Sequence, residues 1–379
     1  MSIQQAVRNI LIVGGGACGG FHGARLALGS GAGINATRVS VVCGGNRAAV
    51  QRDGYKVSYT DAKADADALR FRPQHVFGST LEAAAANVDW HHVMVFTKAV
   101  SDSTVVRVLE PLLSAGAARD TAAPGISNTA SIKTISLWQN GIGIESSLAA
   151  FLAAHSHTSH ITLVSAVMYV GISLREKSGA IIDANRAQRA LLGIYPTQPS
   201  TLPSAFTPET TPQTATANNI VNDSNNLADL AALLAAAKLN AEILPNIQVA
   251  RWHKNLWNAT IGLLGLAGSC APSDIVLNTQ MPQVIALMNE VAATAHAVLG
   301  KPLPFDTMGT FEDLVTLTRT MGSYKASILL DWEAGRDIEL QVIVGNVLEA
   351  AKLHNVATPR LEALYAVVQL MQEMRTLNT

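Results

Sequence analysis

The sequence predicts an α/β protein in which a doubly wound, mostly parallel sheet is followed by an all-helical C-terminal domain. Three observations support this fold class. Short apolar runs alternate with helix-like stretches through the first half of the chain, which is the pattern of right-handed crossovers between parallel strands. A glycine-rich turn joins the first apolar run to the first helical stretch, and beyond residue 248 the apolar spacing is helical throughout.

In the first half, apolar runs predict strands, and the stretches between them predict helices. The strands are expected at 10–13, 39–43, 93–97, 134–137 and 162–170, and the helices at 17–28, 46–53, 101–114 and 145–154. Residues 196–216 hold five prolines among Thr, Ser and Gln, which indicates a surface loop or insertion. A helix is expected to follow, from Ser224 as its N-cap to about Asn240.

Pro245 marks a break before a series of helices. We expect these at 249–266, 281–299, 311–318, 323–334, 338–354 and 359–374. At 379 residues, the chain exceeds a typical domain of roughly 100–200 residues. We therefore place a domain boundary near residue 248, with 1–248 as the sheet domain and 249–379 as the helical domain.

Composition and charge exclude several classes of partner. The 27 basic and 28 acidic side chains give a net charge of -1, which argues against a nucleic-acid-binding face. Cys18, Cys43 and Cys270 share no metal-ligand spacing and suit a reducing compartment. No stretch approaches the roughly 20 apolar residues of a bilayer span, and no signal-peptide pattern opens the chain. We therefore expect a cytoplasmic protein that contacts no membrane and holds no metal.

The glycine-rich turn has the spacing of a dinucleotide-binding loop. Gly14, Gly16 and Gly19 satisfy G-x-G-x-x-G between a strand and a helix, with Ala17 and Cys18 inside the motif. Glycine allows the tight turn, lets backbone N–H groups approach a pyrophosphate, and lets the helix pack closely on the strand. The helix N-terminus adds partial positive charge. This setting favours a Rossmann-type dinucleotide-binding domain over a glycine turn without a ligand.

The end of the second predicted strand bears on the choice of dinucleotide. Residues 43–47, Cys-Gly-Gly-Asn-Arg, include no Asp or Glu to hold the ribose 2′-hydroxyl of NAD. Arg47 is placed to pair with a 2′-phosphate, with help from Asn46. The alternative for Arg47 is an ordinary solvated helix residue. The pattern favours NADPH and does not exclude NADH.

A lysine-bearing helix opens the second domain. Lys254 and Asn258 are four residues apart and share a helical face, while Trp252 and Trp257 occupy other faces. Apolar surroundings desolvate the lysine, which lowers its pKa and makes it a better proton donor near neutral pH. The alternative is a lysine whose ammonium group reaches solvent.

Two further polar residues lie near a helix junction in the second domain. Ser327 is on the same helical face as Asp331, and Gly335 is expected to end that helix. Glu339 starts the next helix, where the helix dipole favours a carboxylate. A surface hydroxyl is the simpler interpretation of Ser327, and helix-end electrostatics is the simpler interpretation of Glu339.

Taken together, these segments resemble the ketopantoate reductases (2-dehydropantoate 2-reductases), and the longer fungal-type members most of all. The matching pieces cover nearly the whole chain in family order: 14–27, 96–98, 139–143, 251–254 with Asn258, and 327–339 followed by Gly345 and Pro359. The resemblance implies a Rossmann domain, an all-helical C-terminal domain, and the NADPH-dependent reduction of a 2-oxo acid in the cleft between them. The substrate it implies is ketopantoate, in pantothenate biosynthesis.

The resemblance also implies a role for each matching residue. Lys254 would be the general acid that protonates the carbonyl oxygen as hydride arrives from the nicotinamide. Glu339 would hold the substrate hydroxyl and the surroundings of the lysine. The substrate-orienting groups would be Asn258, Ser327 and Asn140, and the groups along the nicotinamide and its ribose would be Lys98 and Asn140.

Four positions depart from the family pattern. Gly44 stands where an arginine for the 2′-phosphate is expected, Gly262 and Tyr324 where asparagines are expected, and Ser101 where a glutamine is expected. Because substrate-side polar groups changed while the proton donor stayed, a bulkier or less polar ketone or an imine is an alternative substrate. A non-catalytic NADP(H)-binding sensor is a further alternative. Apolar helices in the second domain leave a homodimer open.

Overall fold

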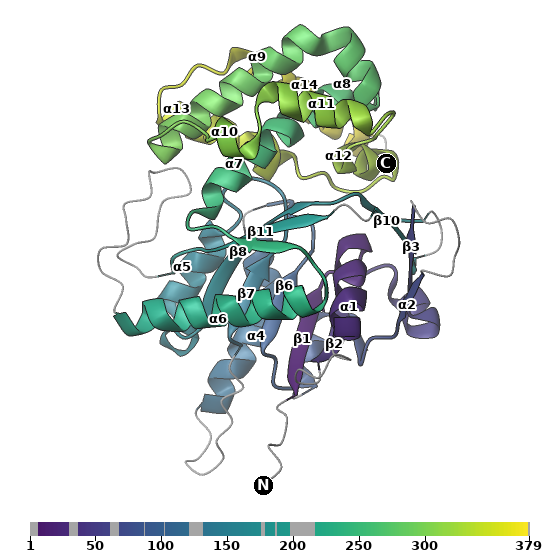
Figure 1. Ribbon diagram of the computed structural model, residues 1–379, viewed down its shortest axis with the longest axis vertical. Helices are drawn as coiled ribbons and strands as arrows, with labels where there is room; N and C mark the ends of the chain where they lie inside the picture. Colours follow the sequence, from purple (N-terminus) through teal and green to yellow (C-terminus); the bar gives the residue numbers. More distant parts are fainter. Residues whose placement is uncertain are drawn as a thin grey trace.

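The computed structural model places a large sheet flanked by helices beneath a cap of helices from the C-terminal part of the chain (Figure 1). It describes residues 7–29, 37–60, 68–86, 88–101, 103–120, 132–175, 179–185, 188–197 and 217–377. The proline-rich stretch expected as an insertion at 196–216 lies almost entirely outside these residues. Within the described parts of the chain, none of the helices combines the length and apolar character that crossing a bilayer requires.

The large sheet has eight strands, in the order β12-β11-β8-β7-β6-β1-β2-β5. All neighbouring pairs are parallel except β8 with β11, which is antiparallel. The predicted doubly wound, mostly parallel sheet is therefore confirmed. Its strands are β1 (Arg8–Val13), β2 (Thr37–Val42), β5 (Val76–Phe77), β6 (His92–Val95), β7 (Thr134–Leu137), β8 (Thr162–Tyr169), β11 (Arg189–Ile194) and β12 (Ala241–Ile243).

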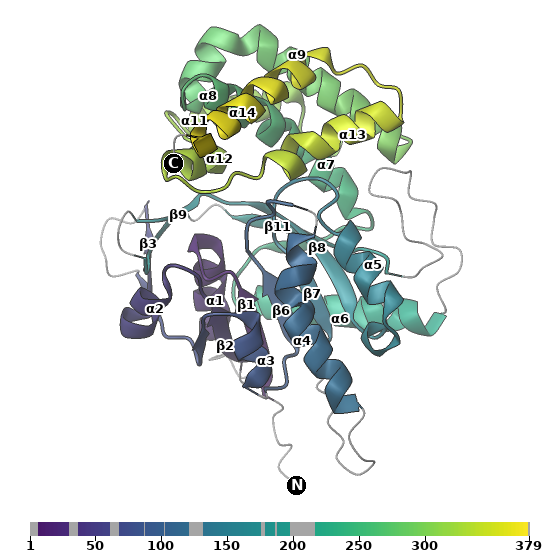
Figure 2. The same ribbon diagram turned by 180° about the vertical axis from the view of Figure 1, so that it is seen from behind.

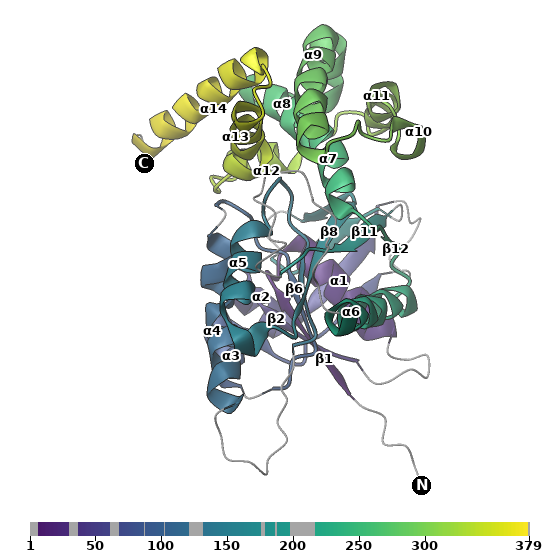
Figure 3. The ribbon, with the colours of Figure 1, turned by 90° about the vertical axis from the view of Figure 1, so that its left-hand side faces the viewer.

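Helices cover both faces of this sheet, as Figures 2 and 3 show. One side carries α4 and α5, and the other carries α1 and α6. The helices of this part are α1 (Ala17–Gly29), α2 (Arg47–Asp53), α3 (Thr80–Ala85), α4 (Thr104–Asp120), α5 (Ser146–Ala154) and α6 (Ala217–Ala236). Because the strands are parallel, their carboxyl ends meet at the edge that faces the helical cap.

A second sheet of four short strands was not predicted from the sequence. Its order is β4-β3-β10-β9, with strands β3 (Tyr55–Tyr59), β4 (Leu69–Phe71), β9 (Ile172–Leu174) and β10 (Ile181–Ala184). Tyr55 packs closely on α1, because a Cβ added to Gly20 would lie 2.5 Å from its ring. Gly20 thus permits close contact between α1 and the second sheet.

The C-terminal part is helical, as predicted. It comprises α7 (Ile247–Trp257), α8 (Leu263–Ala267), α9 (Ser273–Leu299), α10 (Phe305–Met308), α11 (Phe311–Thr320), α12 (Ser327–Glu333), α13 (Asn346–Leu353) and α14 (Pro359–Leu377). Helix α9 begins eight residues before the predicted start at 281, and it continues through a kink. Gln280 leaves the helical region there (φ −125°, ψ 20°), two residues before Pro282, because proline lacks the N–H that a helix needs.

Two segments inside this helical part are π-helical. They are η3 (Asn258–Gly262), which joins α7 to α8, and η4 (Gln341–Gly345), which precedes α13. The sequence predicts ordinary helices at both places, since an extra residue in one turn leaves no clear mark on apolar spacing. One apolar cluster joins the sheet to the helical part and includes Leu11 and Val95 of the sheet together with Trp252 of α7. The division at residue 248 stays a proposal.

Candidate active site

The glycine-rich turn follows β1 and opens α1. Gly14 has φ +104°, in the region that favours glycine, and a Cβ there would lie 2.6 Å from the backbone nitrogen of Thr97. A Cβ on Gly19 would lie 2.1 Å from the carbonyl oxygen of Gly14. These two positions therefore need glycine for the fold itself, whether or not a ligand binds.

Gly16 is different: apart from its two chain neighbours, none of the residues that the structure describes has a heavy atom within 4 Å of a Cβ built on it. It stands directly before Ala17 and Cys18, which begin the 13-residue helix α1. An open space in front of a helix N-terminus suits an anionic group, since the first N–H groups of the helix lack partners within it. The turn thus fits the pyrophosphate of a dinucleotide.

The carbonyl of Gly15 sets the direction of this turn. Its oxygen accepts hydrogen bonds from the Asn46 side chain at 2.6 Å and from the Tyr55 hydroxyl at 2.6 Å. The C=O and the next N–H of a trans peptide point in opposite directions, so the N–H of Gly16 points away from Asn46 and Tyr55. Asn46 therefore supports the loop from behind, a role that its position after β2 did not indicate.

Arg47 and Asn46, expected beside a 2′-phosphate, both have protein partners. Asn46 also donates to the carbonyl of Gly179 at 3.0 Å. Arg47 forms a two-pronged ion pair with Glu82 of α3, at 3.0 and 2.8 Å. The N–H of Gly78 donates to the same carboxylate at 3.0 Å, and this hydrogen bond together with Arg47 lowers the pKa of Glu82. Any contact between Arg47 and a phosphate would have to compete with Glu82.

Four of the predicted site residues form a chain of polar contacts between the sheet and the helical cap. Lys254 donates to the side-chain oxygen of Asn140 at 2.8 Å. The amide of Asn140 donates to Glu339 at 3.5 Å, and Lys98 lies 3.2 Å from the same carboxylate oxygen. Lys98 and Asn140 follow β6 and β7, whereas Lys254 and Glu339 come from the helical part. The structure thus gathers residues that are 241 positions apart in sequence.

Glu339 lies at the centre of these polar contacts. It is 3% exposed, and its second oxygen accepts the backbone N–H of Ala99 at 3.0 Å. Asp331 approaches Lys98 at 2.7 Å. Burial lowers the pKa of Lys98, but the carboxylates of Glu339 and Asp331 outweigh it and raise the pKa above its ordinary value. Lys98 is therefore held as a cation.

The two π-helical segments lie next to this chain. Asn258 begins η3, and η4 starts two residues after Glu339. π-Helical turns are rare and are frequently found at functional sites. Lys254 and Asn258, predicted on one helical face, do line one pocket despite the change of helix type.

That pocket is small: the volume open to a water-sized sphere is about 10 Å³. It is lined by Gln139, Asn140, Gly141, Val167, Arg251, Lys254, Asn255 and Asn258. Two of the predicted substrate-binding residues, Asn140 and Asn258, are thus brought together. Ser327 is exposed at the start of α12 and is not among the lining residues. Its neighbour Ile328 lies 3.4 Å from a Cβ built on Gly262, so the start of α12 packs beside η3.

Lys254 has a lowered pKa, as its apolar setting predicted. Burial is the largest cause and the charge of Arg251 is the second; together they lower the pKa of Lys254 to about 8. Lys98 acts in the same direction, whereas Cys18 and Glu339 oppose it. The ammonium group also lies 5.9 Å from the centre of the Tyr169 ring, close enough for a cation–π contact. At neutral pH, Lys254 is mostly protonated yet able to give up its proton.

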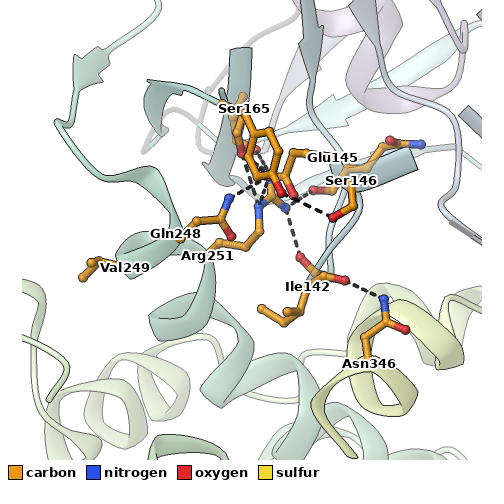
Figure 4. A network of polar contacts seen from close by, with 12 residues as sticks. Ile142, Glu145, Ser146, Ser165, Gln248, Val249, Arg251 and Asn346 are labelled. Atoms are coloured by element: carbon orange, nitrogen blue, oxygen red, sulfur yellow. Dashed lines mark hydrogen bonds and ion pairs between the residues drawn. The ribbon is translucent and has the colours of Figure 1, made fainter. Parts of the chain in front are cut away.

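A buried ion pair behind the pocket was missed by sequence reasoning. Figure 4 shows Arg251 of α7 directed at Glu145 and Ser165, with Gln248 beside them. Arg251 is 3% exposed and Glu145 is fully buried, and their charged groups are 2.8 Å apart. The available signal was an arginine three residues before Lys254, one helical turn from the predicted proton donor. Its buried partner is 106 residues away in sequence, beyond the reach of local patterns.

Comparison with known families accounts for most of the chain. Residues 10–187 match the family profile described as ketopantoate reductase PanE/ApbA. Residues 246–372 match the profile described as ketopantoate reductase PanE/ApbA C terminal. The two matches follow each other in the order of sheet and helical parts.

Individual proteins show the same relationship. An uncharacterized protein of Saccharomyces cerevisiae is 27% identical over 337 residues, which cover 84% of this chain and 83% of that protein. The crystal structure of 2-dehydropantoate 2-reductase from Methylococcus capsulatus superposes with a TM-score of 0.69 at 29% identity, covering 97% of each chain. D-mandelate dehydrogenase, in a ternary structure with NADH and anilino(oxo)acetate, shares the fold with a TM-score of 0.68 at 18% identity, over 97% of this chain and 99% of that one.

Proposed function

Because the chain belongs to the ketopantoate reductase family and is thus a nicotinamide-dependent oxidoreductase acting on CH–OH groups, we propose that it reduces a ketopantoate-like 2-oxo acid to the 2-hydroxy acid with NADPH. The observation that carries the proposal is Lys254. It lines the pocket between the sheet and the helical cap, and its pKa is lowered to about 8. A proton donor of this kind is what a carbonyl needs as negative charge develops on its oxygen.

Lys254 is the general acid in this proposal. NADPH, when bound, supplies hydride to the carbonyl carbon. The ammonium group of Lys254 gives its proton to the carbonyl oxygen, so that the hydroxyl forms without a free alkoxide. One N–H of the lysine is already held by Asn140 at 2.8 Å, which leaves its other two N–H groups for the substrate. The hydrogen bond thus orients the donor before substrate arrives.

Glu339 holds Lys98 and Asn140 in position beside Lys254. Its carboxylate receives Lys98, Asn140 and the N–H of Ala99, so it links the ends of two sheet strands to the helical cap. In the proposal, Glu339 also accepts the substrate hydroxyl. Asn258 and Ser327 orient the carboxylate of the substrate, and the positive charges of Lys254 and Lys98 attract it.

The cofactor assignment is part of the same proposal. Gly14, Gly16 and Gly19, with Ala17 and Cys18, hold the pyrophosphate at the start of α1, and Lys98 and Asn140 lie along the nicotinamide and its ribose. The open side of Gly16 supports this placement. Arg47, with Asn46 behind the loop, selects NADPH by exchanging Glu82 for the 2′-phosphate.

Removing the charge of Glu82 is expected to strengthen NADPH binding. Glu82→Gln keeps an acceptor for the N–H of Gly78 but releases Arg47 from its ion pair. NADPH affinity should therefore rise about two- to fivefold, which corresponds to the free energy of an exposed ion pair. Arg47→Ala should weaken NADPH about tenfold, because it removes the charge-assisted contact to the phosphate. NADH affinity should stay within about twofold in both variants. Fluorescence titration with each dinucleotide measures this, and parallel changes for the two would exclude Arg47 from the 2′-phosphate site.

A bulkier or less polar carbonyl or imine is the second candidate substrate, and Tyr324 favours it. Tyr324 stands where an asparagine was expected and its ring lies 6.0 Å from that of Trp257. Burial raises the pKa of the Tyr324 hydroxyl, and Trp257 is the residue directly before Asn258. Gly262 offers no amide on the side facing α12. The substrate end is therefore more aromatic and less polar than the family pattern.

A substrate panel distinguishes these possibilities. Loss of reduced-nicotinamide absorbance should be followed with NADPH and NADH for ketopantoate, for aromatic and branched 2-oxo acids, and for ketones and cyclic imines. We expect turnover with 2-oxo acids, and fastest with NADPH. Turnover with imines or simple ketones alone would overturn the 2-oxo acid proposal, and rapid turnover with ketopantoate alone would exclude the second candidate and support a place in pantothenate biosynthesis.

Two remaining expectations from the sequence also stay proposals: a homodimer and a cytoplasmic location. For the dimer, α14 presents exposed apolar side chains along one stripe, namely Val367, Leu370, Met374 and Leu377. Exposed apolar surface of this kind is a common feature of protein contacts. Sedimentation of the purified protein decides whether two copies associate.

A further inference from the structure

The buried Arg251–Glu145 pair lies behind the pocket and has no role in the proposed reaction so far. Nε of Arg251 is 2.8 Å from Glu145, and Nη2 donates to Ser165 at 2.6 Å and to the carbonyl of Ala166 at 3.3 Å. Replacing a buried ion pair by apolar side chains is often neutral or stabilising. Stability alone therefore does not explain why two charges are buried beside the proton donor.

The remaining donor of Arg251 reaches the loop that carries Asn140. Nη1 donates to the carbonyl of Gln139 at 2.9 Å and to the carbonyl of Gly141 at 3.1 Å, the residues on either side of Asn140. All three nitrogens of the guanidinium are thus engaged by protein acceptors. Arg251 lines the pocket, but it has no free nitrogen to offer a substrate.

The same loop is held from the helical cap at its next residue. The N–H of Ile142 donates to the carbonyl of Val342 at 2.7 Å, and Asn346 donates to the carbonyl of Ile142 at 2.7 Å (Figure 4). Gly141 adopts φ +98°, and a Cβ there would lie 2.5 Å from Val342. The backbone from 139 to 142 is therefore fixed on both sides, and from it the Asn140 side chain reaches Lys254 and Glu339.

We propose that Arg251, held by Glu145, is a positioning residue for the proton donor: it fixes the backbone on both sides of Asn140, so that the Asn140 carboxamide is set between Lys254 and Glu339 before substrate binds. The proposal rests on Lys254 being the general acid. It assigns Arg251 no contact with substrate or cofactor.

The charge of Arg251 has a second effect in the same place. Lys254 is one turn further along α7, and Arg251 lowers its pKa. The other charged or titratable groups that act on Lys254 are Lys98 after β6, Cys18 of α1 and Glu339 before η4. Removing Arg251 is therefore expected to raise the pKa of Lys254, whereas replacing it by lysine keeps a positive charge nearby.

Two variants separate the fork geometry from the charge. Arg251→Lys retains the positive charge but loses the guanidinium group that bonds to the carbonyls of Gln139 and Gly141. We expect kcat to fall about 10- to 100-fold, because a small misplacement of reacting groups has an effect of this size. The pKa of Lys254 and the Kd for NADPH should change little. The double variant Glu145→Gln with Arg251→Gln leaves no unpaired buried charge, and it should raise the pKa of Lys254 and lower kcat.

The pKa of Lys254 should be measured without turnover, from the pH dependence of its reaction with an amine-specific reagent, with mass spectrometry of the modified peptide. The matched control is Glu290→Gln with Arg360→Gln, which removes an ion pair between α9 and α14 and should leave both kcat and the Lys254 pKa as in the wild type. Thermal unfolding of each variant reports on folding.

The outcomes distinguish this proposal from the proposed function. An unchanged kcat in Arg251→Lys would overturn the positioning role, and an unchanged Lys254 pKa in the double variant would overturn the separate effect of the Arg251 charge. A fall in kcat matched by an equal fall in NADPH affinity and in stability would also overturn the positioning role, because Arg251 would then act only by stabilising the fold. If the wild type turned over no 2-oxo acid but the Lys254 pKa still rose in the double variant, the proposed substrate would be wrong while the link between Arg251 and Lys254 would stand.

Discussion

Replacing Lys254 with methionine is expected to lower kcat for 2-oxo acid reduction about 10²–10⁴-fold, the usual contribution of a positioned general acid. Methionine keeps the length and apolar packing of the lysine side chain but can neither give a proton to the substrate nor donate the orienting hydrogen bond to Asn140. The Kd for NADPH should change little, because the glycine-rich turn and not Lys254 holds the pyrophosphate. Single-turnover measurement of NADPH absorbance, alongside NADPH titration, checks both parts.

The matched control is Lys352→Met, at an exposed position on α13, which should retain wild-type turnover. If Lys254→Met kept kcat within about threefold of the wild type, Lys254 would not be the proton donor. If neither protein turned over any substrate while both bound NADPH, the non-catalytic sensor would be favoured.

Gly16→Val is expected to raise the Kd for NADPH roughly 100-fold, a change of about 2.7 kcal/mol, without lowering the melting temperature by more than a few degrees. The reason is the open space beside Gly16. The Cβ of the new valine would clash with none of the described residues, but the side chain would occupy the space in which we place the pyrophosphate. Isothermal titration calorimetry and thermal unfolding measure the two quantities.

Gly19→Ala is the contrasting variant. Its Cβ would lie 2.1 Å from the carbonyl oxygen of Gly14, so the turn must shift and the protein should lose stability even without ligand. If Gly16→Val bound NADPH as tightly as the wild type, the pyrophosphate would not lie at this turn.

Much of the fold follows from local patterns in the sequence. The strand 134–137 and the start of α1 at Ala17 lie where predicted, because buried parallel strands are continuous apolar runs and helices have a 3.6-residue period. The glycine-rich turn was also predictable, since its shape depends on residues that adjoin it. Lys254 and Asn258 were predicted together because their spacing carries the information.

The parts that could not be predicted depend on distant residues. Strands β3, β4, β9 and β10 are only three to five residues long, so even the alternating burial of β3 and β10 covers too few residues to mark a strand in the sequence. The partner of Arg47 is 35 residues away, and the partner of Arg251 is 106 away. An arginine in a sequence shows its charge but not which carboxylate the fold will bring to it.

The pH dependence of kcat/KM for 2-oxo acid reduction tests the central claim most directly, namely that the ammonium group of Lys254 supplies the proton. The donor must be protonated to act, and its pKa is lowered to about 8. Activity should therefore be full below that value and fall about tenfold per pH unit above it, and this limb should be absent from the residual activity of Lys254→Met. A wild-type rate that stays level from pH 7 to 10, or the same limb in the methionine variant, would contradict the account.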